Sequence, residues 1–309
     1  MNKRILPAYP GFTRRAITFT IDDGNIKWDE KFLSIVRPNG IRGTFNLCSA
    51  RMDREDGFYR EFYRGYGIAN HTENHPFAIA DNETAEFRDE YPTDQPMDEK
   101  VFYLSHTGEG YYMKHLERGW REWADNERYF LNVTNCQQRL ERVFGSEIAT
   151  GFVWPYCEQN NKAVKQFLNE CGFKSIRKTG DVLDTTEFAL PADRMAWSYK
   201  CHNTNLLEVM EKYESSPDNG ELRFFAFGVH SWDFERDGDW DTLTTFAEKY
   251  GNRPSDYWYA TVDEIFAYAD AIDNLVVNEG TIENPTDITL YVELDGTRLT
   301  LSPMSVTEI

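Results

Sequence analysis

AITFTIDDG, residues 16–24, is the stretch that decides how this chain folds. Its apolar residues alternate with two threonines, and this alternation predicts a short, largely buried strand over residues 16–21. The strand ends in adjacent carboxylates, Asp22 and Asp23, which are costly there unless they are paired, hydrated or bound to a cation. Because neighbouring residues on an extended backbone point to opposite sides, we expect Asp22 and Asp23 to have different partners and different roles.

A second stretch, NHTENHP at residues 70–76, supplies groups that a cation near Asp23 would need. His71 and His75 are four residues apart, and one helical turn would direct both imidazoles the same way. Pro76 disfavours helical geometry at His75, so we expect a turn after a strand instead of a long helix. Either histidine alone is more often a loop or capping residue. Together with Asp23 they form a donor set that Zn²⁺ or another divalent first-row metal accepts, with positions left for water and substrate.

Strand-like and helix-like segments alternate along the chain. Strands are predicted over residues 16–21, 42–47, 67–70, 149–153, 173–177 and 222–229, and helices over residues 27–36, 161–171 and 262–272. This alternation predicts a parallel, barrel-like α/β fold. The chemically interesting residues lie at or just after predicted strand ends, which is the functional face of α/β barrels: Asp22, Asp23, His71, Pro155-Tyr156 and His230.

The two motifs together resemble those of the polysaccharide deacetylases of carbohydrate esterase family 4, the NodB-homology domain. Residues 20–24, TIDDG, match the family's TFDDG-like first motif, and residues 71–76, HTENHP, match its second motif, H-[S/T]-x-x-H-P. The resemblance covers roughly residues 14–275. It implies a distorted (β/α) barrel with fewer than eight strands and a hydrolase that removes N- or O-linked acetyl groups from a carbohydrate.

The resemblance also implies roles for individual side chains. Asp23, His71 and His75 would hold a divalent metal, most simply Zn²⁺, with Co²⁺, Ni²⁺ or Mn²⁺ as alternatives. That metal would polarise the acetyl carbonyl and lower the pKa of a bound water. Asp22 would be the general base, and His230, at the end of an apolar strand, would be the general acid that protonates the leaving group.

The third family motif, R-x-P-Y, is incomplete here, because residues 153–156 read VWPY. In the family that arginine steers the base aspartate, and this chain has Val153 in its place. Arg194 is a candidate replacement, and an ordinary surface ion pair is an equal alternative for it. The Tyr156 backbone N–H is expected to help stabilise the oxyanion. Trp154 is either a substrate contact or a core aromatic.

Around His230 the sequence offers supporting groups. Asp233 or another carboxylate is expected to raise the pKa of His230, and Trp232 is a candidate wall for sugar stacking. For the family's fourth motif, which supports the acid, Asp193 and Trp197 are weak candidates. The remaining histidines are assigned to structure or surface by default: His106, His115 and His202.

Two parts of the chain do not belong to the barrel pattern. Residues 82–125 are predicted to be an insertion, which begins as an acidic, proline-punctuated loop and continues into an aromatic stretch. That stretch is either a helix covering the barrel or a lid with aromatic platforms for sugar rings. Near the C-terminus, Asp295-Gly296 predicts the turn of a β-hairpin. We therefore expect a barrel domain over residues 1–280 and a β extension over residues 281–309.

Composition narrows the partners. The net charge is −19, which argues against nucleic acid or an anionic membrane surface as a partner. No apolar run approaches 18 residues, so no membrane span is expected, and the N-terminal residues lack the apolar core of a signal peptide. We therefore expect either a cytoplasmic location or a leader that has been removed. The five cysteines are widely spaced and read as free thiols.

The sequence thus predicts a metal-dependent deacetylase with an acetylated carbohydrate as its partner and an unknown oligomeric state. Two alternatives remain open. The loss of the arginine at Val153 and the aromatic insertion are also compatible with a catalytically weak relative that only binds carbohydrate. A hydrolase of a non-sugar amide would carry the same motifs.

Overall fold

The computed structural model describes residues 5–81, 84–87, 101–107, 110–115, 119–158, 160–178 and 188–309, with the backbone alone described between residues 84 and 123. Its centre is a parallel sheet with the strand order β11-β10-β4-β3-β2-β12, and β13 also pairs with β2. Within the described residues this sheet has seven strands, in keeping with the expected distorted barrel of fewer than eight. The strand bounds are β2 Arg15–Asp23, β3 Thr44–Leu47, β4 Gly67–Asn70, β10 Ala149–Val153, β11 Ser175–Arg177, β12 Arg223–His230 and β13 Trp258–Tyr259.

The edge strands β11 and β12 do not pair directly within the described residues, and the segment 197–201 lies between them. Single parallel bridges join Arg177 to Trp197 and Cys201 to Phe227, so this segment contacts both edges. The sheet is therefore curled into an incomplete barrel, and the carboxyl ends of its strands converge on one rim.

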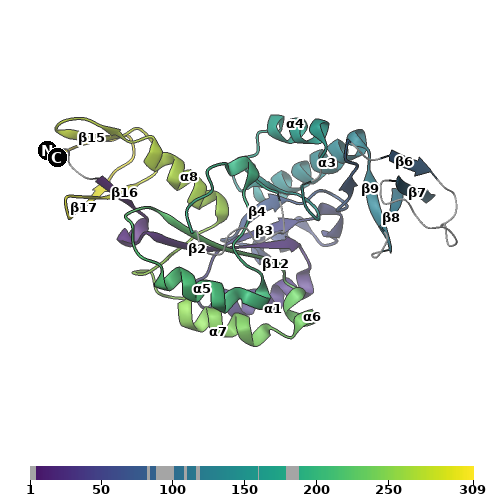
Figure 1. Cartoon of the computed structure of the whole chain (residues 1–309), viewed down its shortest axis with the longest axis horizontal. Helices are drawn as coiled ribbons and strands as arrows, with labels where there is room; N and C mark the ends of the chain where they lie inside the picture. The colour runs from purple at the N-terminus through teal and green to yellow at the C-terminus, as the bar shows by residue number, and fades with distance from the viewer. Residues whose placement is uncertain are drawn as a thin grey trace.

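Helices cover the sheet on two sides (Figure 1). One group lies below it in Figure 1: α1 Ile26–Val36, α5 Leu206–Ser215, α6 Asp233–Asp237 and α7 Trp240–Tyr250. The other helices are α2 Asp56–Phe62, α3 Asn126–Phe144, α4 Lys162–Glu170 and α8 Val262–Asp273. The buried residues of β2 and β12 form one apolar core with those of α1, α5 and α7, which explains why these strands read as almost continuously apolar.

The predicted barrel elements are confirmed, with shifts of a few residues at their ends. Gly172 follows Cys171, the C-cap residue of α4, and has φ +77°, the left-handed conformation in which many helices end. No helix in the described part of the chain combines the length and apolarity that a membrane span needs. None of the five cysteines forms a disulfide within the described residues.

The insertion differs from the sequence expectation. Its backbone forms strands β6 Thr84–Phe87, β7 Val101–Thr107, β8 Gly110–His115 and β9 Gly119–Ala124, which pair with one another and, through β9, with β5 Phe77–Ala78. The helical alternative for residues 101–123 is therefore wrong, because aromatic and β-branched residues pair here as strands. Whether their aromatic side chains form sugar platforms lies outside the described residues, as do the side chains of His106 and His115.

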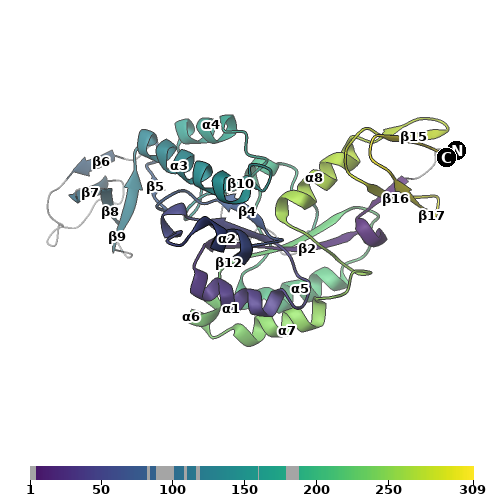
Figure 2. The same cartoon turned by 180° about the vertical axis from the view of Figure 1, so that it is seen from behind.

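At the opposite end of the molecule the predicted hairpin is present (Figures 1 and 2). β16 Leu290–Leu294 and β17 Thr297–Leu301 pair around Asp295 and Gly296, both of which have positive φ. β16 also pairs antiparallel with the N-terminal strand β1 Ile5–Ala8, a partner that the sequence did not indicate. A neighbouring sheet contains β14 Val276–Val277, β15 Thr281–Asn284 and β18 Ser305–Glu308, so it spans the predicted domain boundary at residues 280 and 281.

Candidate active site

A cavity of about 1070 Å³ opens at the carboxyl ends of the parallel strands. The structure brings most of the residues singled out in the sequence to its wall: Asp22, Asp23, His71, His75, Tyr156, His230, Trp232 and Asp233. They come from the end of β2, from the turn after β4, from the loop after β10, and from the end of β12 and the start of α6. Their convergence follows from the parallel sheet, which places the ends of all these strands on the same rim.

Asp23 shows why the two adjacent carboxylates can both face this cavity. Its φ is +84°, in the left-handed region, so the strict alternation of an extended strand ends at Asp22. Asp22 and Asp23 nevertheless have different partners, as expected. Asp23 Oδ2 forms an ion pair with Arg51 Nη1 at 2.7 Å, whereas Asp22 pairs with residues of β3 and β11.

The metal-ligand candidates His71 and His75 lie beside the other oxygen of Asp23. The Nε2 atoms of His71 and His75 are 3.7 Å and 3.5 Å from Asp23 Oδ1. The His71 Nδ1–H donates to the Val153 backbone carbonyl at 2.8 Å. This bond fixes the tautomer of His71, because it leaves the lone pair on Nε2, the atom that faces Asp23.

The segment that carries these histidines is a tight turn and not a helix. Thr72 and His75 have φ values of +66° and +59°. The Thr72 N–H donates to Asn70 Oδ1 at 2.8 Å, and the His75 N–H donates to Thr72 Oγ1 at 3.0 Å. The side-chain acceptors of Asn70 and Thr72 thus hold a backbone conformation that brings the two imidazole centroids within 4.7 Å of each other.

The chemistry of this donor set fits a divalent metal ion. Asp23 Oδ1 and His71 Nε2 are buried and have no hydrogen-bond partner within the described part of the chain. Burial lowers the pKa of His71, and burial together with the nearby His71 lowers the pKa of His75 to about 3. Both imidazoles are therefore neutral at physiological pH and have a lone pair to share, which is the state that metal binding requires.

Asp22 is held by two strands. Arg177 Nη2 donates to Asp22 Oδ2 at 2.5 Å, and Asn46 Nδ2 donates to Asp22 Oδ1 at 2.6 Å. Burial alone would raise the pKa of Asp22, but Arg177, His71 and His230 together hold this pKa well below its usual range. Asp22 is therefore an ionised carboxylate over the physiological pH range.

Arg177 is the residue that the sequence analysis missed. It ends β11, and it is the cross-strand neighbour of Val153 in β10. The arginine expected at position 153 is thus present one strand further along the sheet, with its guanidinium almost completely buried. Its position at the end of the predicted strand 173–177 was the signal that could have identified it, since that strand end lies on the same rim as the others.

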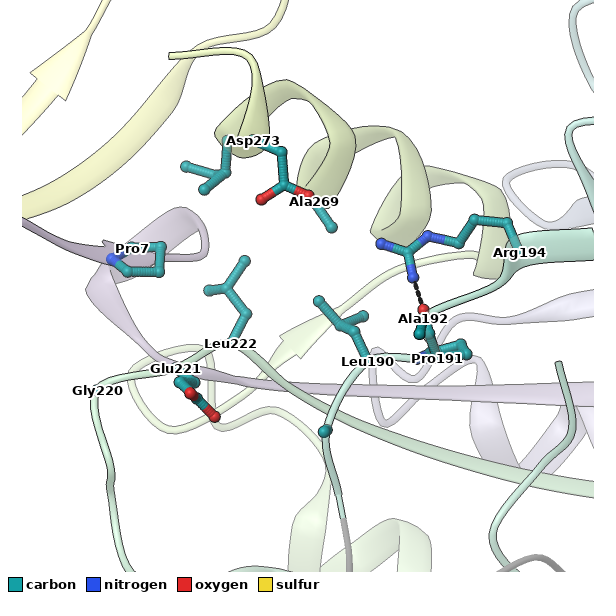
Figure 3. Close-up of a pocket in the computed structure, with 12 residues that line it drawn as sticks. Pro7, Leu190, Pro191, Ala192, Arg194, Gly220, Glu221, Leu222, Ala269 and Asp273 are labelled. Atoms are coloured by element: carbon teal, nitrogen blue, oxygen red, sulfur yellow. Dashed lines mark hydrogen bonds between the residues drawn. The ribbon is translucent and has the colours of Figure 1, made fainter. Parts of the chain in front are cut away.

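Arg194, the replacement considered from the sequence, lies elsewhere. It donates to the backbone carbonyl of Pro191 and lies 3.4 Å from Asp270, on the wall of a separate cavity of about 360 Å³ (Figure 3). That cavity is also lined by Pro7 and Leu222, which precede β2 and β12, so it is at the amino end of the sheet. The alternative of an ordinary ion pair is the one that the structure supports for Arg194.

His230 lies opposite the metal-ligand candidates. Its Nδ1 is 3.0 Å from Asp233 Oδ2, and its backbone N–H donates to the same oxygen at 2.8 Å. Its Nε2 faces Asp23 Oδ2 at 3.9 Å. Burial opposes the charged form, but the hydrogen bond to Asp233 and the charges of Asp22 and Asp23 outweigh it and raise the pKa of His230.

Asp233 therefore provides the support expected for His230, and the fourth-motif candidates do not. Asp193 caps a short turn by accepting from the Met195 N–H at 2.8 Å. Trp197 is buried in the core against Phe224 and Phe266. Neither residue lines the active-site cavity.

Of the three aromatic candidates, Tyr156 and Trp232 line the cavity and Trp154 does not. Tyr156, with φ +64°, packs its ring on Phe77 at 3.8 Å and on His75 at 4.5 Å. The Trp232 ring is stacked on His230 with a centroid separation of 4.6 Å. Trp154, by contrast, is only 4% exposed and packs in the core against Tyr129 and Phe152, so the structure does not bring it to the cavity.

Further wall residues had no assigned role in the sequence. His202, assigned by default to structure or surface, lines the cavity, and its Nε2 is 3.2 Å from the Tyr199 hydroxyl. The Arg177 guanidinium lies over the Tyr199 ring at 5.2 Å. Tyr199 thus connects His202 to Arg177, the residue that donates to Asp22.

Comparisons with known proteins found similar solved structures and one family model. A family 4 carbohydrate esterase from Streptomyces lividans has 14% identity and a TM-score of 0.43, with 76% of this chain and 89% of that chain covered. A carbohydrate esterase domain of a xylanase from the hindgut metagenome of Trinervitermes trinervoides has 12% identity, a TM-score of 0.47 and coverage of 83% and 92%. A peptidoglycan deacetylase from Bacillus subtilis has 12% identity, a TM-score of 0.43 and coverage of 84% and 95%.

No curated protein sequence matches this chain at a significant level. The family model for polysaccharide deacetylases, in contrast, matches residues 10–176, which is more than half of the chain. The matched region contains both aspartates of the first motif and both histidines of the second. By that match, this chain belongs to the polysaccharide deacetylase family.

Proposed function

We propose that this protein is a metal-dependent hydrolase that removes acetyl groups from a carbohydrate. The observation that carries the proposal is the pair of buried atoms without hydrogen-bond partners in the described chain, Asp23 Oδ1 and His71 Nε2, with His75 Nε2 beside them. A divalent ion held by these three side chains, most simply Zn²⁺, would polarise the acetyl carbonyl and make water a stronger acid.

Asp22 is the general base of the proposed reaction. The donors Arg177 and Asn46 orient its carboxylate, and the charge of Arg177 keeps it ionised, so it is ready to accept the proton of the attacking water. Because its pKa is low, Asp22 also releases that proton easily and is regenerated for the next turnover.

His230 is the general acid. The water oxygen bonds to the acetyl carbon, the bond from that carbon to the sugar nitrogen or oxygen breaks, and His230 gives its proton to the departing amine or alcohol. The carboxylate of Asp233 supports this role, because it raises the pKa of His230 and so increases the protonated fraction at neutral pH.

Tyr156 and Trp232 bind the substrate in this proposal. The left-handed conformation of Tyr156 turns the chain at the cavity wall, where its backbone N–H would donate to the oxyanion. Trp232 lines the cavity with its ring stacked on His230 and close to the Arg236 guanidinium, and it is the proposed aromatic contact for a sugar ring.

The position of Arg177 weakens the main argument for a relative that only binds carbohydrate. That alternative rested on the missing arginine at Val153, and Arg177 makes the equivalent contact to Asp22. A binding protein would also have no need for His230 to be held by a buried carboxylate.

The test is acetate release from metal-stripped protein on acetylated xylan, chitin oligosaccharides and acetylated mannan, before and after addition of Zn²⁺ or Co²⁺. We expect release to return with the metal and to fall by about two to four orders of magnitude in Asp22→Asn. Stoichiometric metal uptake without release from any of these substrates would contradict the proposal and favour a binding protein or an amidase for another substrate.

A further inference from the structure

Cys48 lies at the base of the proposed metal site. It is the first residue after β3, and β3 runs between the two strands that lead to the metal-ligand candidates. In the sheet register, Leu47 pairs with Asp23 on one side and with Asn70, the residue before His71, on the other. The chain therefore places Cys48 between Asp23 and His71.

The side chains confirm this placement. Cys48 Sγ, a carboxylate oxygen of Asp23 and a ring nitrogen of His71 all lie within 4.8 Å of one another, and all three residues are buried. Two of these residues each have a buried atom without a hydrogen-bond partner in the described chain, Asp23 Oδ1 and His71 Nε2. The thiol makes a hydrogen bond of 3.3 Å to the His71 backbone carbonyl, a weak interaction that can be exchanged for a stronger one.

We propose that Cys48 is a sulfur ligand of the ion held by Asp23, His71 and His75. This inference rests on the proposed function, because it requires that the site binds a divalent metal. Sulfur and nitrogen donors around one Zn²⁺ are separated by about 3.5–4 Å, since Zn–S is about 2.3 Å and Zn–N about 2.0 Å. Cys48, Asp23 and His71 already have donor atoms within 4.8 Å of one another, so these three reach that spacing by a shift of at most about 1 Å, and the thiol releases its proton to solvent when it binds.

A thiolate ligand has a consequence for metal selectivity. Thiolate favours Zn²⁺ and Co²⁺, whereas carboxylate and water ligands are equally acceptable to Mn²⁺ and Mg²⁺. Cys48 thus biases this centre towards the softer ions. A site of two histidines and one aspartate without sulfur would discriminate between these ions less strongly.

The test is the absorption spectrum of the Co²⁺-loaded protein, because sulfur coordination gives a near-ultraviolet charge-transfer band that oxygen and nitrogen ligands do not give. Wild type, Cys48→Ser and Cys136→Ser are compared at stoichiometric Co²⁺. Cys136 is the matched control, since it is a buried thiol that donates to the backbone of the same strand, at Leu47. Zn²⁺ and Mn²⁺ affinities of the three proteins are measured by chelator competition.

We expect the charge-transfer band in wild type and Cys136→Ser and its loss in Cys48→Ser, with visible cobalt bands present in all three. We also expect Cys48→Ser to weaken Zn²⁺ binding by about tenfold and to change Mn²⁺ binding much less. Cobalt bound by the wild type without a charge-transfer band would overturn the sulfur ligand and leave the proposed function standing. Failure of the wild type to bind cobalt at all would overturn both.

Discussion

Asp23 divides its two carboxylate oxygens between different tasks. Oδ1 faces the two imidazoles, while Oδ2 accepts from Arg51 and lies near His230. Arg51 compensates the charge on Oδ2. Oδ1 can therefore stay directed towards the proposed metal position. A single left-handed residue at the strand end makes this division possible.

The contact between His230 and Asp233 gives a prediction for pH dependence. In the proposed reaction the protonated form of His230 is the active one, and its raised pKa keeps this form present at higher pH. In Asp233→Asn the carboxylate charge is lost, so the pKa of His230 falls and activity is lost at lower pH. We expect the alkaline limb of the kcat/KM profile to move down by about one pH unit.

Asp237→Asn is the matched control for that experiment. Asp237 lines the same cavity and accepts from Arg236 and Asn203, and none of its contacts in the described residues is with His230. The alkaline limb of the kcat/KM profile of Asp237→Asn should lie at the same pH as that of wild type. An unchanged limb in Asp233→Asn would mean that another group sets it.

At the scale of the elements, the neighbouring strands β10 and β11 offer two positions from which an arginine can reach Asp22. Val153 and Arg177 are cross-strand partners, so their side chains lie on the same face of the sheet. We expect Arg177→Val to reduce kcat by about a hundredfold, because Asp22 loses its orienting charge. The double variant Val153→Arg/Arg177→Val should recover part of that loss, as measured by acetate release.

Metal affinity separates this effect from simple misfolding. Arg177 contacts none of the proposed metal ligands by hydrogen bond in the described chain, so Zn²⁺ binding should be similar in Arg177→Val and wild type. If Arg177→Val also lost Zn²⁺ binding, the role of Arg177 would be to stabilise the sheet and not to orient Asp22.

The same element scale explains what the sequence could predict. The apolar strands and three of the helices, α1, α4 and α8, were found from periodicity, whereas the other described helices were not predicted. The rule that parallel strand ends share a rim brought Asp22, His71 and His230 together correctly. The backbone at Asp23 and Thr72 was not predictable, because side-chain acceptors and neighbouring strands impose positive φ there. Arg177 was missed because a sequence motif is searched along a single strand, here β10. The arginine that contacts Asp22 lies on the neighbouring strand, β11.

Longer-range pairing was the other failure of sequence reasoning. The strands β6 to β9 lie in a region whose aromatic residues suit either a helix or a sheet, and only pairing with one another decides between the two. The pairing of β1 with β16 left no local signal, since the two strands lie near opposite ends of the sequence.

At the scale of the whole molecule, the C-terminal extension and the active site occupy opposite ends of the parallel strands. Tyr268 of α8 joins the extension to the barrel, because its hydroxyl donates to Ala8 and accepts from the Tyr291 N–H. Leu290 belongs to the extension and is fully buried in the apolar core that the extension shares with α8. We expect Leu290→Ala to lower the free energy of unfolding by about 2–4 kcal/mol in urea titrations, with unchanged kcat/KM for the folded protein.

Met304→Ala provides the comparison within the same extension. Its side chain is 74% exposed, so its removal should change the free energy of unfolding by less than about 0.5 kcal/mol. A loss of kcat/KM in Leu290→Ala at full folding would show that the extension communicates with the site.

The pairing of β1 with β16 also sets an order of events during protein synthesis. β1 emerges from the ribosome before any other described strand, whereas β16 emerges after almost all of them. Until β16 is made, β1 has no partner along the edge that it will use, and an unpaired edge of this kind attracts incorrect pairing in a nascent chain. The barrel can assemble while translation continues, but β1 has to wait until β16 has left the ribosome.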